Sequence, residues 1–410
     1  MADSPLAGRV VIDLTSALAG PYATLLLAGL GARVIKVENP LNGGDQARGN
    51  APYLSEDGLT LTRRSPRDMS VSMLVRGRGK QSVTLNLKHP RGREVFGDLV
   101  RRADVVVENF SAGVADRLGI GYDFAARLNP KIVYTSISGF GAQGGPGSGK
   151  AMDTIVQALS GLMATSGDPG GPPVRSGLPL ADLTAPLFAV VGTLAALMQA
   201  ERTGRGQHVD VSMLGALTSL VACEPFDALE AVGLPARTGP VMPRLAPFGI
   251  FPAADGWFAV CAPTDGFAHG LLKAMGREDL IEEFRTRDRR VERADRLHEL
   301  VAEWSSARPL REILDLLTEH GVPAAPVRDP ATAVRDPLVL EREEVVPLSH
   351  PRYEHAGELY GTGVPIRFSA ARARLETPAP DLGEHNAEVY GGLLGYSEEH
   401  IRELAEDGVI

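Results

Sequence analysis

An aspartate stands inside an otherwise apolar stretch, SGLPLADLTAPLFAV (176–190), where a carboxylate needs a reason. Asp182 precedes an apolar helical pattern, so its oxygens could cap the free N–H groups of the first helical turn. It could instead be a nucleophile, because a carboxylate in a partly dry pocket attacks an acyl carbon more readily. Taken by itself, the stretch favours the cap, which is the commoner role for such a residue.

Two glycine-interrupted segments could contact a ligand. Basic residues crowd around a predicted strand in GRGKQSVTLNLKHPRGR (77–93). Phosphate groups need such cations at strand and helix ends, where backbone N–H groups also face the anion. A solvated charged surface is the commoner reading of that pattern. The segment GFGAQGGPGSGK (139–150) could supply a mobile cover and backbone donors, and a plain flexible loop is an equal alternative.

Several function classes lack their signatures. The net charge of −9 over 410 residues argues against a nucleic-acid binder, which needs a basic surface. The turn TSALAGPYAT after the first predicted strand holds a single glycine where a dinucleotide fingerprint needs three. Neither a GxSxG elbow nor a P-loop occurs. The nine histidines are scattered, so no metal site is predicted.

Cysteine content and hydropathy indicate a cytoplasmic protein. The two cysteines, Cys223 and Cys261, lie in apolar surroundings and are predicted to be buried free thiols in a reducing compartment. The N-terminal residues MADSPLAGR lack the features of a signal peptide. The longest apolar run, 185–200, is too short to span a bilayer comfortably. It predicts a core helix and no membrane partner.

The first half of the chain must form the scaffold for these residues. Short β-branched runs alternate with helical patterns, which predicts an α/β fold with a doubly wound parallel sheet. The runs expected to be strands are RVVIDLT (9–15), ARVIKVE (32–38), QSVTLNL (81–87), DVVVENF (104–110) and KIVYTSISGFG (131–141). Residues 39–80, rich in Gly, Arg and Ser, are expected to form a long loop that covers or contacts a ligand.

Beyond residue 200 the pattern changes. AERTGRGQHVDVSML (200–214) predicts a turn and a further strand, and GIFPAADGWFAVCAP (249–263) predicts a hairpin. PLREILDLLTEHGV (309–322) predicts a helix that stops at Gly321. These elements indicate a smaller α+β unit. The extended GTGVPIRFS (361–369) precedes a tail with two short amphipathic helices.

At this level of detail the chain resembles the family III coenzyme A transferases and the related 2-methylacyl-CoA racemases. The segments that carry the resemblance are RVVIDLTSALAGPYATLLLAGLGARVIKVENP, QSVTLNLKHPRGREVF, ADVVVENFSAGVADRLGIGYDFAARLNPKIVYTSISGFG, VQALSGLMATSGDPGGPP, ADL at 181–183, ERTGRGQHVDVSML and PAPDLGEHNAEVYGGLLGY. They follow one another in order over nearly the whole chain, and the combination of VENF, SxSGFG and TGRGQxVDVSM is specific.

The resemblance implies an interlocked homodimer in which each chain threads the other. A large Rossmann-like, CoA-binding domain would begin with residues 1–224, and a small α+β domain would follow over 225–330. Residues 331–410 would provide a linker and return to the large domain. The acyl group would lie under the small domain.

The resemblance also implies the activity. A family III CoA-transferase moves coenzyme A from an acyl-CoA donor to a free carboxylic acid, through an aspartyl anhydride and an aspartyl-CoA thioester. Asp182 stands at the matching position, which turns the balance toward the nucleophile, although a capping role could coexist. Coenzyme A enters as a thioester substrate, so no permanently bound cofactor or metal is implied.

The family's coenzyme A contacts carry over one position at a time. They fall on Leu18, Ala19, Leu85, Lys88, Asn109, Phe110, Arg117, Lys150, Met152 and Asp153. Leu85 and Lys88 match the strand and the lysine beside the adenosine phosphates, and Asn109, Phe110 and Arg117 match positions nearby. Leu18 replaces the glutamine of the transferases, and Asn39 replaces a phosphate-binding arginine of some members, so the chain departs from the pattern at those two positions.

Two other functions are also considered for this sequence. The related racemases use a His-Asp pair to move protons, and here the pair reads Met152-Asp153, in which methionine carries no proton. A non-catalytic CoA-binding protein is the third reading, against which the retained Asp182 argues. The two acids exchanged are not evident from the sequence. Arg244 could pair with a distal carboxylate of the substrate or form an ordinary salt bridge.

Overall fold

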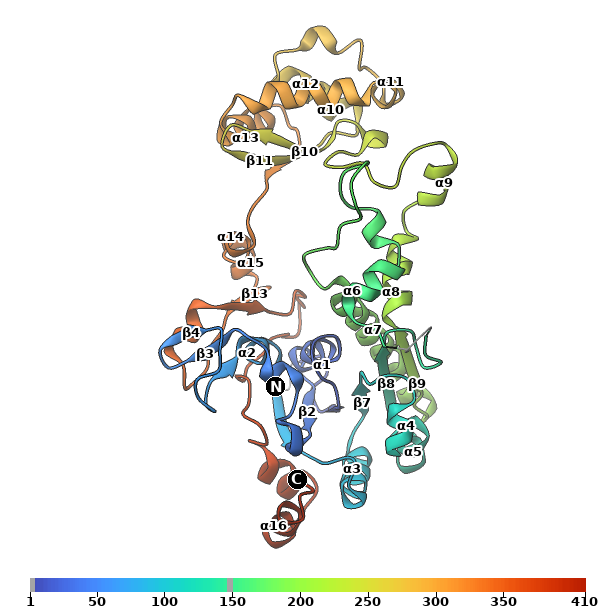
Figure 1. Cartoon of the computed structure of the whole chain (residues 1–410), viewed down its shortest axis with the longest axis vertical. Coiled ribbons are helices and arrows are strands. Elements are labelled where there is room, and N and C mark those ends of the chain that lie inside the picture. The colour runs from blue at the N-terminus through green and yellow to red at the C-terminus, as the bar shows by residue number, and fades with distance from the viewer. Residues whose placement is uncertain (1–3, 146–149) are drawn as a thin grey trace. The chain divides into compact units, whose positions relative to one another are not determined.

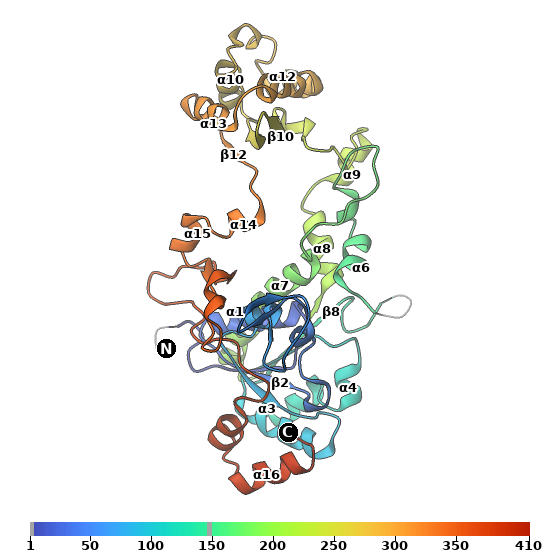
Figure 2. The same ribbon diagram turned by 60° about the vertical axis from the view of Figure 1, so that its left-hand side comes forward.

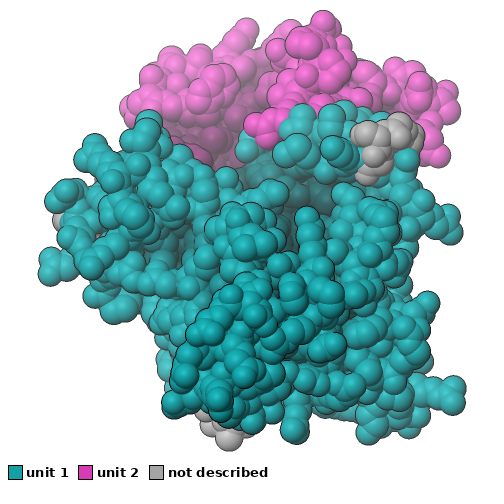
Figure 3. Space-filling view, turned by 60° about the horizontal axis from the view of Figure 1, so that its bottom comes forward, with its two compact units in different colours: residues 1–160, 177–221, 334–410 teal, residues 161–176, 222–333 magenta. Residues whose placement is uncertain are grey.

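The chain folds into two compact units. The computed structural model describes residues 4–145 and 150–410. Unit 1 comprises residues 1–160, 177–221 and 334–410, and unit 2 comprises residues 161–176 and 222–333. Figure 3 shows unit 1 in teal and unit 2 in magenta.

A six-stranded parallel sheet forms the centre of unit 1. Its strands, in spatial order, are β6 (Lys80–Thr84), β2 (Arg33–Glu38), β1 (Val10–Asp13), β7 (Val105–Glu108), β8 (Val133–Ser138) and β9 (His208–Ser212). The central strands β1 and β7 consist almost entirely of Val and Ile, as expected for strands that are covered on both faces. The order reverses between β1 and β7, as in a doubly wound nucleotide-binding sheet, and the parallel α/β prediction is confirmed.

Helices cover both faces of this sheet. The helices of the region are α1 (Ala19–Gly29), α3 (Pro90–Arg102), α4 (Val114–Leu118), α5 (Tyr122–Leu128), α6 (Asp153–Leu159), α7 (Leu180–Thr203) and α8 (Met213–Val221). Helices α1 and α7 pack together on one face. On the other face, Val95 and Phe96 of α3 join a core with Ile12, Ile35 and Val106 of the strands.

The C-terminal residues return to the same core. The π-helix η7 (Ala387–Leu393) and helix α16 (Glu398–Glu406) contribute Tyr390 and Leu404 to the cluster that contains β1 and α3. The Tyr390 hydroxyl donates a 2.7 Å hydrogen bond to the Thr84 carbonyl at the end of β6. Figures 1 and 2 both show α16 beside α3. The two ends of the chain therefore stabilise one domain.

The segment after β2 is more ordered than the sequence indicated. Instead of a long loop it forms η1 (Pro40–Asn42), η2 (Gln46–Gly49), β3 (Tyr53–Ser55), β4 (Gly58–Thr60), β5 (Met69–Ser70) and α2 (Val71–Arg76). The strands β4-β3-β5 form an antiparallel sheet. Strands this short carry too little periodicity to detect, and Leu54 packs against Leu348 and Tyr353 from far along the chain. These partners belong to the segment with α15 (Pro337–Glu341), β13 (Val345–Pro347), η6 (Glu354–Glu358) and β14 (Tyr360–Thr362).

Helix α7 is longer than its apolar run suggested. It extends over 24 residues, and among the described residues it is the one helix that could cross a membrane by length and composition. It packs against α1, β8 and β9, as the core helix of a globular domain does. The structure therefore supports the prediction of a core helix.

Unit 2 combines helices with a small antiparallel sheet. It contains the hairpin β10 (Phe248–Ala253) and β11 (Gly256–Cys261), joined antiparallel with Ala253 opposite Gly256 and extended by β12 (Ala324–Pro326). The helices are η3 (Leu162–Ala164), α9 (Phe226–Ala231), η4 (Pro243–Leu245), α10 (Asp265–Ala274), η5 (Glu278–Leu280), α11 (Arg287–Glu292), α12 (Ala294–Ser306), α13 (Leu310–Glu319) and α14 (Pro330–Ala333).

The prediction that both cysteines are buried was wrong. Neither forms a disulfide, but Cys223 is exposed and Cys261 is half-buried. The apolar neighbours of Cys223 in the sequence do not bury it, because α8 ends at Val221 and the segment that follows is exposed at the start of unit 2.

Candidate active site

A cavity of about 660 Å³ opens at the carboxyl ends of the central strands, within unit 1. The segments that follow β1, β2, β6, β7 and β8 all contribute to its lining, together with Asp182 of α7. Ligands of doubly wound proteins bind at this edge of the sheet, where the strand order reverses. The cavity is therefore the natural binding site of this unit.

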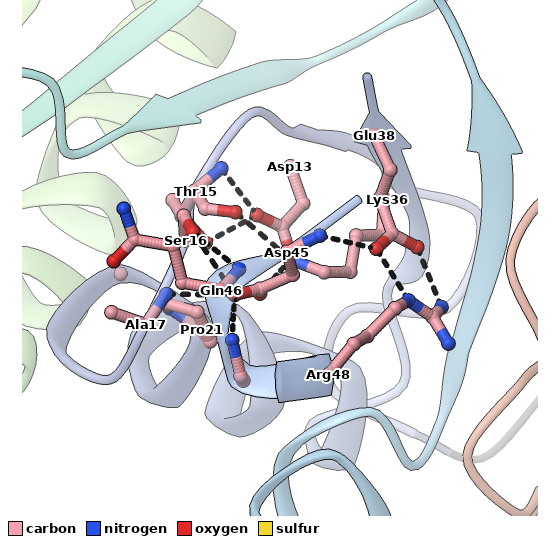
Figure 4. Close-up of polar contacts among 12 residues, drawn as sticks. Asp13, Thr15, Ser16, Ala17, Pro21, Lys36, Glu38, Asp45, Gln46 and Arg48 are labelled. Carbon is pink, nitrogen blue, oxygen red and sulfur yellow. Dashed lines mark hydrogen bonds and ion pairs between the residues drawn. The ribbon is translucent and has the colours of Figure 1, made fainter. Parts of the chain in front are cut away.

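The turn between β1 and α1 is held almost entirely by side chains (Figure 4). Asp45 Oδ1 accepts hydrogen bonds from the Ala17 N–H at 2.8 Å and from the Ser16 hydroxyl at 3.0 Å. The Asn109 amide bonds both the N–H and the carbonyl of Ser16, each at 2.9 Å. Ala17 has a φ of +69°, a strained value for a residue with a Cβ atom. The surrounding contacts hold the backbone in that conformation beside the cavity.

Buried charges underlie this turn. Lys36 donates to the Thr15 carbonyl at 2.9 Å and pairs with Asp45 at 2.7 Å between its Nζ and Oδ2. Lys80 pairs with Asp13 at 3.0 Å, and these lysines and Asp13 are almost fully buried. Burial alone would raise the pKa of Asp13, but Lys36 and Lys80 outweigh it and lower the pKa to about 2. The ion pairs thus remain charged at neutral pH.

Gly20 allows α1 to begin against this turn. A Cβ atom at position 20 would lie 2.3 Å from the Cβ of Thr15 and 3.0 Å from the Asn109 amide carbon. The single glycine of the TSALAGPYAT turn therefore serves close packing of helix and strand. It does not belong to a dinucleotide fingerprint.

Asp182 lies in the first turn of α7 and does not cap it. The N-cap residue is Pro179, and no side chain of the N-cap accepts a hydrogen bond. Asp153, at the start of α6, instead accepts the Ala181 N–H at 2.9 Å, and its other oxygen accepts from the Gln157 amide at 2.8 Å. The capping carboxylate is therefore Asp153, and among the described residues none donates a hydrogen bond to the Asp182 carboxylate.

The environment of Asp182 disfavours its charge. Burial and the neighbouring Asp153 raise the pKa of Asp182 to about 6, while Arg76 acts in the opposite direction. The carboxylate is half-buried, lines the cavity and has no ion-pair partner within 4 Å in the described part of the chain. A poorly solvated carboxylate of this kind is ionised at neutral pH and remains available to react.

Most of the residues singled out in the sequence meet at this cavity. Those that line it are Leu18, Ala19, Leu85, Lys88, Asn109, Phe110, Met152, Asp153 and Asp182. Arg117 does not line it, although it belongs to α4, whose Val114 and Leu118 do. Lys150 is exposed and does not line it either. Part of the glycine-rich segment considered as a cover, residues 146–149, lies outside the described residues.

The basic segment 77–93 divides among different roles. Lys80 and Arg78 are buried, and Arg91 pairs with Asp407 of the C-terminal tail. Lys88 lines the cavity just beyond β6. The pattern of basic residues is therefore neither one solvated face nor one phosphate site.

Several residues near the cavity were not identified from the sequence. Asp45 and Arg76 belong to the segment interpreted as a loop, and Lys36 lies inside a strand with no spacing signal. Glu108, in VENF, accepts a 2.6 Å hydrogen bond from the Phe110 N–H, and burial raises the pKa of Glu108 to about 7. A charged residue inside a buried strand is the signal that could have identified Lys36 and Glu108.

Two further sequence hypotheses concern ligands. Arg244 forms an ion pair with Glu224 within unit 2. This contact is the ordinary salt bridge that the sequence offered as the alternative to a substrate contact. In the described part of the chain, no group of three or more His, Cys, Asp or Glu side chains is placed to hold a metal ion.

The position of Asp182 yields a stability prediction. A carboxyl whose folded pKa exceeds its ordinary value near 3.8 stabilises the fold below that value and loses this contribution as the pH rises through about 6. Asp182→Asn removes the ionised form, so we expect a melting temperature roughly 1–3 °C above wild type at pH 7.5 and no difference near pH 3.5. Thermal melts of Asp153→Ala provide the contrast, because loss of the true cap should lower the melting temperature. A lower melting temperature for Asp182→Asn at pH 7.5 would restore the capping role.

Comparison with known proteins identifies the family. A family model described as CoA-transferase family III matches residues 6–386. The formyl-CoA:oxalate CoA-transferase of Streptomyces avermitilis is 36% identical over 99% of both chains. The succinyl-CoA:mesaconate CoA-transferase of Haloarcula marismortui is 38% identical over 92% of this chain and 94% of its own. A CaiB/BaiF family protein from Brucella suis has a similar crystal structure, with a TM-score of 0.80 at 32% identity over 95% of this chain and 100% of that one. The chain therefore belongs to CoA-transferase family III and is an enzyme of that type.

Proposed function

We propose that Asp182 is the nucleophile through which this enzyme moves coenzyme A from an acyl-CoA donor to a free carboxylic acid. The observation that carries the proposal is the isolation of its carboxylate. Asp182 lines the cavity, lacks a hydrogen-bond donor among the described residues and has a pKa raised to about 6. The neighbouring Asp153 has both oxygens engaged by Ala181 and Gln157, which makes it a positioning carboxylate.

The chemistry follows in four balanced steps. An Asp182 oxygen attacks the thioester carbonyl, the C–S bond breaks and the coenzyme A thiolate leaves, which gives a mixed anhydride. The thiolate then attacks the Asp182 carbonyl carbon, and the donor acid departs as a carboxylate. The acceptor carboxylate attacks the aspartyl-CoA thioester, releases the thiolate and forms a second anhydride. Attack of the thiolate on the acceptor carbonyl yields the new thioester and regenerates Asp182.

The properties of Asp182 suit this exchange. Every step transfers an acyl group between a carboxylate and a thiolate without a change of oxidation state, so the reaction requires no redox group. Weak solvation makes the carboxylate a better nucleophile, and Leu18, Phe110 and Met213 supply apolar walls to the cavity. The racemase alternative gains no support, since Met152 carries no proton and Asp153 is held by backbone and amide donors.

We further propose that coenzyme A binds along the carboxyl ends of the strands. Lys88 lines the cavity beyond β6, and Asn109 and Phe110 line it beyond β7, which supports their roles as contacts to the cofactor portion of the thioester. The Arg117 guanidinium lies near Gly113 at the start of α4, from which it could reach a phosphate at the rim. Lys150 remains a proposed phosphate contact on the resemblance alone.

The acids exchanged are proposed from the relatives. Their names specify oxalate, mesaconate, succinate and glutarate, which are small dicarboxylic acids. We propose acids of this size as substrates of this chain, and we propose the cytoplasm as its location.

A homodimer is proposed as the working form. Helix α7 carries large apolar side chains that are exposed in the single chain, among them Phe188, Val191 and Met198. An apolar helix face of this kind is typical of an interface. A second copy of this chain, interlocked with the first as the family resemblance implies, is the proposed occupant.

The nucleophile is tested by substitution and trapping. Asp182→Asn should lower kcat by at least about 1,000-fold while the protein stays folded, because an amide does not form the anhydride. In wild type, an acyl-CoA without acceptor should leave an adduct on Asp182 that hydroxylamine converts to a hydroxamate, detected by mass spectrometry. The acid limb of kcat/KM should have a midpoint near pH 6, since Asp182 must be ionised. Asp123→Asn, on an exposed carboxylate of α5, is the control. Full activity of folded Asp182→Asn excludes the proposal.

Coenzyme A contacts are tested by a KM-against-kcat comparison. Lys88→Ala and Arg117→Ala should each raise KM for acyl-CoA by about tenfold with little change in kcat, because phosphate binding is shared by ground and transition states. Lys131→Ala is the matched control, since this exposed lysine precedes β8 at the opposite edge of the sheet. A KM equal to that of wild type removes the residue from the site.

The dimer is tested in solution. Sedimentation at micromolar concentration should give twice the chain mass, and the melting temperature should rise with protein concentration, since association stabilises the fold. Val191→Glu combined with Met198→Glu should weaken association by charging the exposed face of α7. An active monomer at micromolar concentration contradicts the proposal.

A further inference from the structure

Arg76 is the last residue of α2. Its guanidinium has no hydrogen-bond or ion-pair partner in the described part of the chain. It is partly buried, and its Nε atom is fully enclosed with no acceptor. The neighbouring basic residues all have partners: Arg48 pairs with Glu38, Arg78 donates to Thr362, and Lys80 pairs with Asp13. Since buried polar groups are nearly always bonded, this exception needs a reason.

The charge of Arg76 acts on the nucleophile. Burial lowers the pKa of Arg76, and the carboxylates of Asp45 and Asp182 oppose that effect. Arg76 in turn holds the pKa of Asp182 below the value that burial and Asp153 would give it. The two side chains are therefore near enough to interact and yet do not form an ion pair within 4 Å.

In the described part of the chain, Asp45 forms no ion pair within 4 Å with Arg76. Its Oδ2 pairs with Lys36, and its Oδ1 already accepts from Ser16, Ala17 and Ala47. Both oxygens of Asp45 are therefore engaged by the residues that hold the β1–α1 turn. Arg76 therefore interacts electrostatically with Asp182, while its guanidinium nitrogens have no acceptor in the described part of the chain.

A guanidinium of this kind suits a carboxylate ligand. Its nitrogens match the two oxygens of a carboxylate in a bidentate arrangement, and exclusion from water strengthens the pairing. The reacting carboxylate of a substrate must reach Asp182. A guanidinium bound to that substrate carboxylate would make the carboxylate a weaker nucleophile. A second carboxylate, at the far end of a dicarboxylic acid, suffers no such penalty.

We propose that Arg76 binds the unreactive carboxylate of a dicarboxylic acid, or of a dicarboxylic acyl group, while the other carboxyl reacts at Asp182. The proposal rests on the proposed function and names the substrate class of the same site. It also reassigns a role considered for Arg244, whose guanidinium is paired with Glu224.

The test compares succinate with butyrate, which has the same chain length and one carboxylate fewer, as acceptors from one donor thioester. Arg76→Gln should lower the ratio of kcat/KM for succinate to that for butyrate by at least about tenfold. Any shift in the pKa of Asp182 acts on both acids and cancels in the ratio. Arg76→Lys should restore part of the preference, since it keeps the charge without the fork. Arg67→Gln is the matched control, because this exposed arginine pairs with Glu56.

A readout without turnover separates this proposal from the transfer mechanism. Succinate should raise the melting temperature of wild type more than butyrate does at equal concentration, and Arg76→Gln should abolish the difference. A wild type that binds succinate through Arg76 but transfers no coenzyme A would overturn the proposed function alone. An unchanged kcat/KM ratio in Arg76→Gln, or a wild type that succinate and butyrate stabilise equally, would overturn the role of Arg76.

Discussion

The buried ion pair between Lys36 and Asp45 positions the β1–α1 turn beside the cavity. A lysine inside a parallel sheet is stable only if carboxylates and carbonyl groups replace its water, and here Asp13, Asp45 and the Thr15 carbonyl do so. The same contacts fix the β1–α1 turn in a strained conformation at Ala17. Removing one partner of a buried ion pair destabilises a fold by about 3–5 kcal/mol. Loss of Lys36 or Asp45 is therefore expected to disrupt both the ion pairs and the β1–α1 turn.

This network also explains how carboxylates in one region take different roles. Asp13 and Asp45 are paired with lysines and remain structural. Asp153 spends both oxygens on the start of α7 and on Gln157. Asp182 is left without a donor in the described part of the chain, beside the charge of Arg76. Under the proposed mechanism, the reactive carboxylate is the one that lacks a donor in the described part of the chain, and residue type alone does not distinguish it from the others.

Sequence patterns predicted the elements whose periodicity is strong. The β-branched runs gave the parallel sheet, and the apolar runs around Ala253 and Gly256 gave the hairpin. The family motifs led to residues that line one cavity, Asp182 among them. The capping role of Asp153 and the exposure of Cys223 depend on where segments end and meet, which local patterns do not encode. Asp45 and Arg76 were missed because short strands stabilised by distant residues such as Tyr353 resemble a loop.

We propose that Asp182 becomes covalently acylated in each cycle, and transfer of isotopic oxygen into its side chain tests this acylation. If the acceptor carboxylate carries ¹⁸O, its bridging oxygen in the second anhydride stays with the aspartate when the thiolate takes the acyl group. After turnover, the peptide that contains Asp182 should carry the label in that side chain, and peptides that contain Asp153 or Asp45 should not. Complete turnover with unlabelled Asp182 would show that coenzyme A passes between the acids without this carboxylate. That result would contradict the proposed acylation of Asp182.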